Sequence, residues 1–208
     1  MPGKYLCAAI LALTLLAPAA SQAATPPPLE AYGELPAIEG MALSPTGNSV
    51  AAISTVKGKR LLLALDSNMN LLRMFDVGDE KVRDFEWIGD EAVLLILSQT
   101  QSLPMGFTAD QHEFFSAIII PIDDGEEMIP VFGRQKDILD AVFGSYGLRK
   151  IDGNWHAFFG GVQMGRNSSG RTFFDHGRPT LFDVDLADGK GRRLADPGHE
   201  GQDKEWLI

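Results

Sequence analysis

The fold class of this chain follows from the stretch Arg60-Leu-Leu-Leu-Ala-Leu-Asp66 and the apolar run that comes after it, Leu71-Leu-Arg-Met-Phe75. Two asparagines lie between the runs, and this residue type tolerates the backbone conformations that a tight hairpin needs. The same arrangement returns at 114–132 and at 180–194. The pattern predicts an antiparallel hairpin in each of the three segments.

A fixed spacing links these three hairpins. In each one an Asp closes the first strand, and an apolar residue lies nine positions later in the second strand. The three pairs are Asp66 and Phe75, Asp123 and Phe132, and Asp185 and Leu194. The turns between them contain Asn or Asp-Gly, which suits tight connections. We therefore expect the three hairpins to share one register.

A second hairpin precedes each of these pairs, so that every unit has four strands in up-and-down order. The upstream turns are Ser44-Pro-Thr-Gly47, Ile88-Gly-Asp90 and Ile151-Asp-Gly153. The predicted units are 37–76, 82–133 and 147–196. A further unit is expected to begin at 203–208, because Trp206 follows Leu194 by the interval that separates Trp87 from Phe75.

Four-stranded units that repeat every roughly 40 to 65 residues are typical of a β-propeller. A single sheet of this size is marginal alone, and lateral packing on neighbours buries its faces. The alternative is an antiparallel sandwich, which has similar strands but gives no reason for the repeated spacing. We expect an all-β partial propeller of three blades plus the first strand of a fourth. An unpaired blade edge would favour self-association.

Two insertions and one helix are predicted between the strands. Residues 99–113 and 162–179 interrupt the second and third units at equivalent places, and loops of that length often bind or gate. Residues 135–143 carry apolar side chains at intervals that suggest a short helix between units.

The N-terminus has the three parts of a secretory signal. Lys4 precedes an apolar run, and small residues lead to a predicted cleavage after Ala23. A buried N-terminal helix is the alternative. We expect a signal peptide at 1–23, a proline-rich linker at 24–36, and the incomplete propeller at 37–208. The product would be periplasmic or secreted, and cleavage would remove Cys7, the only cysteine.

The chain is acidic, with a formal net charge of −10 that becomes −11 when Lys4 leaves with the signal peptide. Such a surface repels phosphate backbones, because binding them requires neutralisation by Lys and Arg. Nucleic acid is therefore not expected as a partner. After the leader, no segment is apolar enough to predict a membrane span.

The serines give no hydrolase motif. A nucleophile elbow needs Gly-x-Ser-x-Gly between a strand and a helix. Ser145 lies in Phe143-Gly-Ser-Tyr-Gly147, where the first glycine is displaced by one position, and Ser168 and Ser169 lie out of register in 165–170. We interpret all three as loop serines and predict no catalytic residue.

No metal or cofactor site is predicted. Asp183, Asp185 and Asp188 superficially resemble a calcium loop, but the position that needs a carboxylate is Leu194. The histidines lack metal-ligand spacing; they are His112, His156, His176 and His199. Three pairs of adjacent phenylalanines are interpreted as core or blade-face residues; they are Phe114 and Phe115, Phe158 and Phe159, and Phe173 and Phe174.

Several motifs together resemble the propeller of the prolyl oligopeptidase family of serine peptidases, in its exported bacterial dipeptidyl or acylaminoacyl peptidase branch. They are Leu35-Pro36-x-Ile38 leading into Leu43-Ser-Pro-Thr-Gly47, Val82-Arg83 with Phe85-x-Trp87, and the hairpin 181–194. The resemblance covers 35–208, although each motif alone also occurs in TolB-like propellers.

The resemblance implies a propeller that restricts peptide access to a C-terminal α/β-hydrolase domain or chain. That domain supplies the Ser-Asp-His triad, and no position of this sequence matches it. We therefore expect a substrate-gating propeller portion without peptidase activity of its own. The alternative is a stand-alone TolB-like periplasmic scaffold that binds a protein or ligand.

Overall fold

The computed structural model describes residues 26–33, 36–102, 109–170, 172–174, 178–195 and 206. The chain divides into two compact units, 1–34 and 35–208. The first contains a short 3₁₀ helix, η1 (Leu29–Tyr32). The predicted leader lies outside the described residues, and so does the predicted start of a fourth blade, apart from Trp206.

Three four-stranded antiparallel sheets form the second unit. The first sheet contains β1 (Ile38–Leu43), β2 (Ser49–Val56), β3 (Lys59–Asp66) and β4 (Leu71–Asp76). The second contains β5 (Lys81–Ile88), β6 (Ala92–Ser102), β7 (Gln111–Pro121) and β8 (Ile129–Pro130). The third contains β9 (Ser145–Ile151), β10 (Asn154–Gly161), β13 (Thr180–Asp185) and β14 (Lys190–Ala195).

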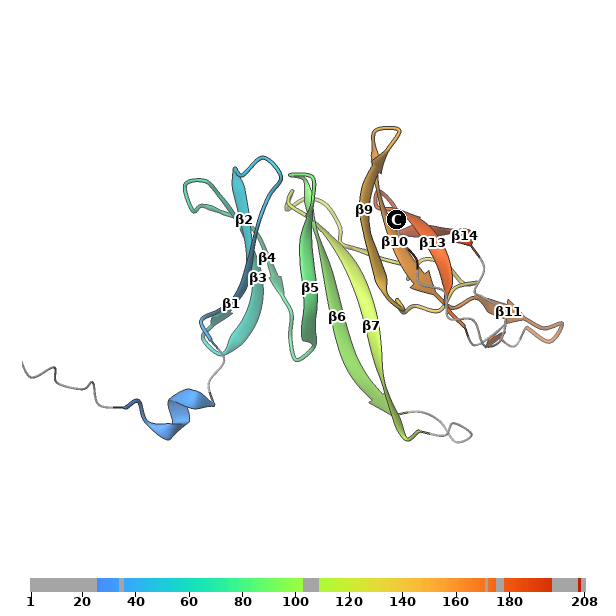
Figure 1. Ribbon diagram of the computed structural model, residues 1–208, viewed down its shortest axis with the longest axis horizontal. Coiled ribbons are helices and arrows are strands. Elements are labelled where there is room, and N and C mark those ends of the chain that lie inside the picture. The colour runs from blue at the N-terminus through green and yellow to red at the C-terminus, as the bar shows by residue number, and fades with distance from the viewer. Residues whose placement is uncertain are drawn as a thin grey trace, which may run out of the picture. The chain divides into compact units, whose positions relative to one another are not determined.

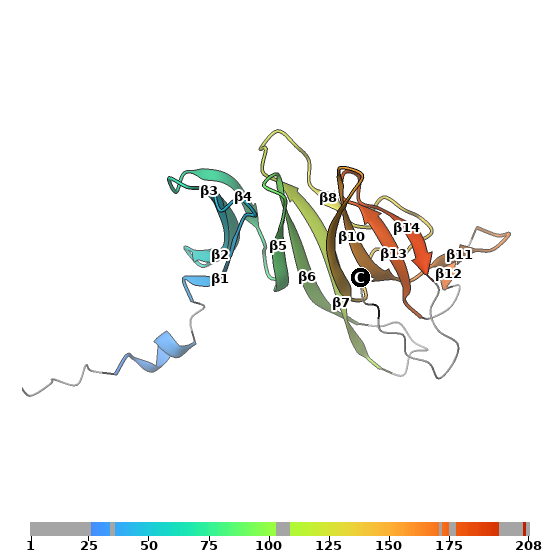
Figure 2. The same cartoon turned by 45° about the horizontal axis from the view of Figure 1, so that its top comes forward.

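The strands of each sheet pair in chain order, and the sheets follow one another with the second in the middle (Figures 1 and 2). This is the arrangement of successive propeller blades. The prediction of an all-β partial propeller is confirmed, and the strands do not pair as the two layers of a sandwich.

The core explains why the first half of strand β6 in the second sheet reads as a continuous apolar sequence. Leu95 and its alternate neighbours on β6 pack against the first sheet, in a cluster that includes Ile53 and Leu62. Leu94, which points to the opposite side, packs against the third sheet in a cluster with Phe159. Because successive side chains of a strand face opposite ways, a sheet covered on both faces needs apolar residues at every position.

The first sheet is also apolar on the face that points away from the second sheet. Strand pairing places Met41, Leu63 and Met74 in one row across this face. Met41 is 60% exposed and Met74 is 56% exposed, and Leu43 and Leu71 are similarly open. Several exposed apolar side chains gathered on one sheet face are unusual for a monomeric protein and indicate a surface that another element covers.

The predicted common hairpin register is wrong for the second sheet. In the first sheet the residue four positions before the Asp, Leu62, faces the residue nine positions after it, Phe75. In the third sheet, a bulge shifts the equivalent strand pairing by one residue. In the second sheet Ile119 faces Ile129, only six positions after Asp123. Strand β8 is two residues long, and Pro130 has no N–H for the ladder.

The apolar residues nine positions after each Asp are also not equivalent. Phe132 is fully buried and lies outside β8 with a positive φ of 64°. Phe75 is partly buried against the core between the first and second sheets. Leu194 is 49% exposed on β14. The shared spacing therefore does not correspond to one shared packing position.

The predicted helix at 135–143 is wrong. The segment is irregular, and its backbone bonds to the neighbouring sheets: the N–H of Val142 donates to Phe115 O at 2.9 Å, and that of Leu139 donates to Val162 O at 2.9 Å. Ile138 and Val142 are buried. Their spacing fits a helix face, but the edges of two sheets supply the hydrogen-bond partners that a helix would otherwise provide internally.

Both predicted insertions contain strand. Strands β6 and β7 continue as a paired ribbon as far as Ser102 and Gln111. The second insertion holds a separate hairpin of β11 (Met164–Arg166) and β12 (Thr172–Phe174). Phe173 and Phe174 on β12 are each 47% exposed and lie outside the four-stranded sheets, so the predicted core or blade-face position is wrong for this pair.

Candidate functional site

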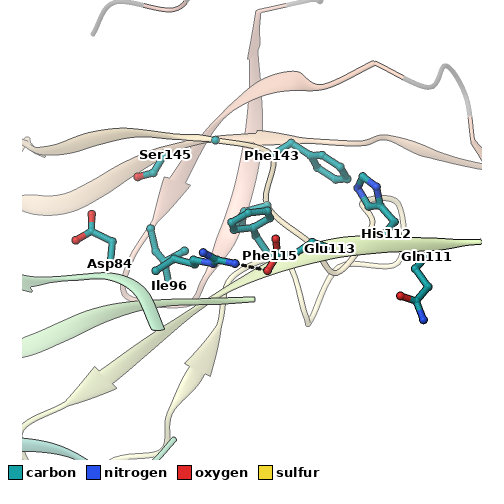
Figure 3. A pocket seen from close by; sticks show the side chains of 11 residues that line it. Asp84, Ile96, Gln111, His112, Glu113, Phe115, Phe143 and Ser145 are labelled. Carbon is teal, nitrogen blue, oxygen red and sulfur yellow. Dashed lines mark hydrogen bonds and ion pairs between the residues drawn. The ribbon is translucent and has the colours of Figure 1, made fainter. Parts of the chain in front are cut away.

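A cleft of about 720 Å³ lies between the second sheet and the segment that leads into β9. Its volume is in the range of pockets that hold small ligands. The apolar part of its wall is formed by Ile96, Phe115, Val142 and Phe143. Figure 3 shows Asp84 and Ser145 toward one side of the cleft, and Phe143 with His112 toward the other. This cleft is the candidate functional site.

The wall contains a network of ion pairs and hydrogen bonds whose members bind one another. Arg83 binds Glu113 and donates from Nε to Ser98 Oγ at 2.7 Å. Ser98 Oγ in turn donates to Glu113 Oε1 at 2.9 Å, and Lys81 Nζ donates to the same oxygen at 3.1 Å. The hydrogen bonds from Arg83, Ser98 and Lys81 lower the pKa of Glu113 from 4.5 to about 2. Glu113 is therefore a carboxylate at neutral pH, and the two cations that share it leave this network with one net positive charge.

Asp84 is the acid of the cleft that this network leaves out. Its carboxylate accepts the backbone N–H of Phe85 at 2.9 Å, and no described cation pairs with it. Glu86 follows on the same strand. Burial, and then the charge of Asp84, raise the pKa of Glu86. Of the two carboxylates that line the cleft, Asp84 is therefore the one without an ion pair in the described chain.

The serines considered in the sequence lie apart from acid–base partners. Ser145 begins β9 and lines the cleft, and its hydroxyl has no hydrogen-bond partner among the described residues. Ser169 lies in a turn, where its N–H and Oγ donate to Asn167 Oδ1 at 3.2 and 2.7 Å. No His or Asp of the described chain forms a hydrogen bond to either serine hydroxyl.

The three aspartates that superficially resemble a calcium loop do not gather around one site in the structure. Asp185 and Asp188 accept backbone N–H groups of their own turn, from Ala187 and Lys190. Asp183 instead lies 5% exposed on β13. In the described part of the chain, no three His, Cys, Asp or Glu side chains gather as a metal site would require. His176 and His199 lie outside that part.

Asp183 connects three strands of the third sheet. His156 Nδ1 on β10 lies 2.6 Å from Asp183 Oδ1, and Arg192 Nη2 on β14 donates to Asp183 Oδ2 at 2.9 Å. Burial alone raises the pKa of Asp183, but the hydrogen bonds and charges of Arg192 and His156 outweigh it, so that the net shift is below the ordinary 3.8. The carboxylate is thus stabilised in its charged form.

Replacing Asp183 by Asn is expected to lower the free energy of unfolding at neutral pH by about 1–2 kcal/mol, since one charged hydrogen-bond acceptor is lost. Because the folded pKa is lowered, this contribution is full above the ordinary carboxyl pKa and disappears as pH falls through the folded pKa. The measurement is denaturant unfolding of both proteins over an acidic pH series, in which the curves should converge. Asp79→Asn, at an exposed position without an ion pair in the described chain, is the matched control. A constant difference down to the lowest pH would contradict the assignment.

The sequence interpretation missed the cleft residues as a group. The signal that could have found them is the charged pair Arg83 and Asp84 in a strand that is otherwise largely apolar, together with Glu113 beside two phenylalanines. What brings them together is the packing of 142–145 against the second sheet, which the residue pattern did not show.

The fold and cleft define a partial propeller with a ligand-sized pocket between adjacent blades. No protein-family model matches the chain, and no curated protein matches it significantly. No described helix has the length and apolarity to cross a membrane.

Among solved structures, the chain is similar to an ACO/RPE65 chimera in a monoclinic crystal form. The identity is 15% and the TM-score 0.36, over 71% of this chain and 34% of that chain. It is also similar to Kuenenia stuttgartiensis hydrazine synthase, at 11% identity and a TM-score of 0.36, over 75% of this chain and 58% of that one. The chain thus spans about a third of the length of the first of these proteins and somewhat over half of the length of the second. Similarity at this level gives no argument about function.

Proposed function

We propose that this chain is the propeller portion of an exported serine peptidase of the prolyl oligopeptidase family. In this role it restricts the access of peptides to a hydrolase domain or chain and performs no chemistry itself. The residues that resemble the family support the proposal by their places: 44–47 forms the β1–β2 turn, Phe85 and Trp87 lie on β5, and 181–194 spans the β13–β14 hairpin.

The observation that carries the proposal is the outer face of the first sheet. Its inner face packs on the second sheet through Ile53 and Leu62, and its outer face exposes Met41 and Met74. A further four-stranded blade would cover that face in the way that each sheet of this chain covers its neighbour. Such a blade belongs to a larger propeller, which is the kind that can gate a catalytic domain.

The coding sequence beyond codon 208 tests this proposal. A reading frame that continues through further four-stranded units to a Gly-x-Ser-x-Gly motif is the expected result. The purified chain should not cleave short chromogenic peptides. Turnover that is abolished by Ser145→Ala or Ser168→Ala would contradict the proposal, as would a stop codon at 209 in a chain that is monomeric.

The alternative is a stand-alone TolB-like scaffold that binds a protein or ligand. The cleft beside Phe115 and Phe143 is the observation that favours it, since a gating role does not require a pocket between blades. In this case a second copy would cover the outer face of the first sheet. The signal-like N-terminus supports a periplasmic or secreted location under either proposal.

A further inference from the structure

The cleft between the second and third sheets combines an apolar wall with one carboxylate that no described cation neutralises. Phe115 on β7 and Phe143 before β9 provide aromatic surface from the two sides. Asp84 on β5 provides the charge, and the hydroxyl of Ser145 lies on the same side of the cleft (Figure 3).

The charges of the wall decide which kind of ligand fits. The guanidinium of Arg83 lies 5.8 Å from the Phe115 ring centroid and is bound to Glu113 and Ser98. Lys81 is also bound to Glu113. Both cations are held by the one carboxylate of Glu113, so an anionic ligand would have to compete with Glu113 for them. A cationic ligand meets Asp84 with no internal competitor.

The surroundings reinforce this preference for positive charge. The whole chain has a formal net charge of −10, although β5 itself carries Lys81 and Arg83 as well as Asp84 and Glu86. A negative potential raises the local concentration of cations near an open cleft. The apolar wall does not suit a bare metal ion, because a hard cation needs several oxygen ligands and, among the described residues of the cleft, Asp84 alone has a carboxylate outside an ion pair.

We propose that this cleft binds a small organic cation, whose ammonium group pairs with Asp84 and whose aromatic or branched apolar body packs on Phe115 and Phe143. The hydroxyl of Ser145 can accept a hydrogen bond from the ammonium group. The inference is independent of any peptidase role, since it uses only residues of the second sheet and of 142–145.

Three probes that share a phenylethyl group test the proposal on the purified chain at neutral pH and low ionic strength: 2-phenylethylamine, 2-phenylethanol and 3-phenylpropionate. We expect the amine to bind about fivefold more tightly than the alcohol, which is the gain that an exposed ion pair provides. The carboxylate should bind most weakly. Added salt should reduce the preference for the amine, because it screens the ion pair. Chemical-shift titration measures all three affinities.

Two variants separate the charge from the apolar wall. In Asp84→Asn the amine and alcohol should bind equally, whereas Asp79→Asn, the same change on an exposed turn outside the cleft, should keep the fivefold ratio. Phe143→Ala should weaken the amine and the alcohol together by about three- to tenfold, as loss of an aromatic contact does. Phe143→Leu should restore part of that loss.

The proposal is overturned if the amine shows no preference over the alcohol in the unmodified chain. It is also overturned if the carboxylate binds best, if none of the three probes binds, or if Asp84→Asn retains the preference for the amine. If Asp79→Asn lost the preference for the amine as fully as Asp84→Asn, the preference would come from the overall charge of the chain. That result would also overturn the proposed site.

Discussion

Replacing Phe132 by Ala is expected to lower the free energy of unfolding by about 3–5 kcal/mol, the usual cost of removing a fully buried phenylalanine ring. The ring is 0% exposed and meets Phe182 edge to face at a centroid distance of 5.3 Å. Phe132 N–H also donates to Gly189 O at 3.0 Å. The side chain therefore closes the core between the second and third sheets, and its removal leaves a cavity there.

Denaturant unfolding monitored by tryptophan fluorescence measures the effect. Phe173→Ala is the matched control, since this ring is 47% exposed, and its loss should change stability by less than about 1 kcal/mol. Phe132 has a positive φ of 64°, so Phe132→Gly should be no less stable than Phe132→Ala, because glycine adopts this conformation without strain. Equal midpoints for Phe132→Ala and Phe173→Ala would contradict the packing described.

Gly160→Ala is expected to cost about 3 kcal/mol or more. A Cβ at this position on β10 would collide with the backbone carbonyl of Phe143, which cannot rotate away as a flexible side chain can. The two backbones are joined by hydrogen bonds from Phe143 N–H to Gly160 O at 2.7 Å and from Gly160 N–H to Gly144 O at 3.1 Å. Relief of the collision would break these bonds and displace one wall of the cleft.

The same unfolding measurement tests this prediction, with Gly125→Ala as the control. At Gly125 the nearest atom to an added Cβ is a side-chain oxygen of Asp123 at 3.3 Å, and we expect a change of about 0.5 kcal/mol or less. Gly160→Ala should also weaken probe binding in the cleft, whereas Gly125→Ala should not. A fully stable Gly160→Ala protein would show that the 142–144 segment does not pack against β10.

Most strands could be predicted from the sequence because their signals are local. The apolar run 60–66 and its Asn-containing turn specify a hairpin without reference to the rest of the chain. The Asp152-Gly153 turn likewise has left-handed φ values of 49° and 93°, as its residue types favour. Grouping by fours then follows from the repeated order of these hairpins.

The errors occur where a remote part of the chain supplies the partner. Residues 135–143 have helical spacing, yet the N–H groups of Val142 and Phe143 donate to strands β7 and β10, so these donors do not need the internal bonds of a helix. The Asp123 hairpin has the composition of the other two, but Phe132 gains more by entering the core between sheets than by remaining in β8.

The amino-acid sequence alone determined the all-β class, the hairpins and their assembly into four-stranded units, because alternation and turn chemistry act between near neighbours. Only the tertiary structure decided the register of the second hairpin, the path of 135–143 and the cleft that joins Asp84 to Phe143. These features depend on which backbones approach closely enough to bond and on which side chains fill the space between sheets. Such contacts link residues far apart in the chain, and no local pattern encodes them.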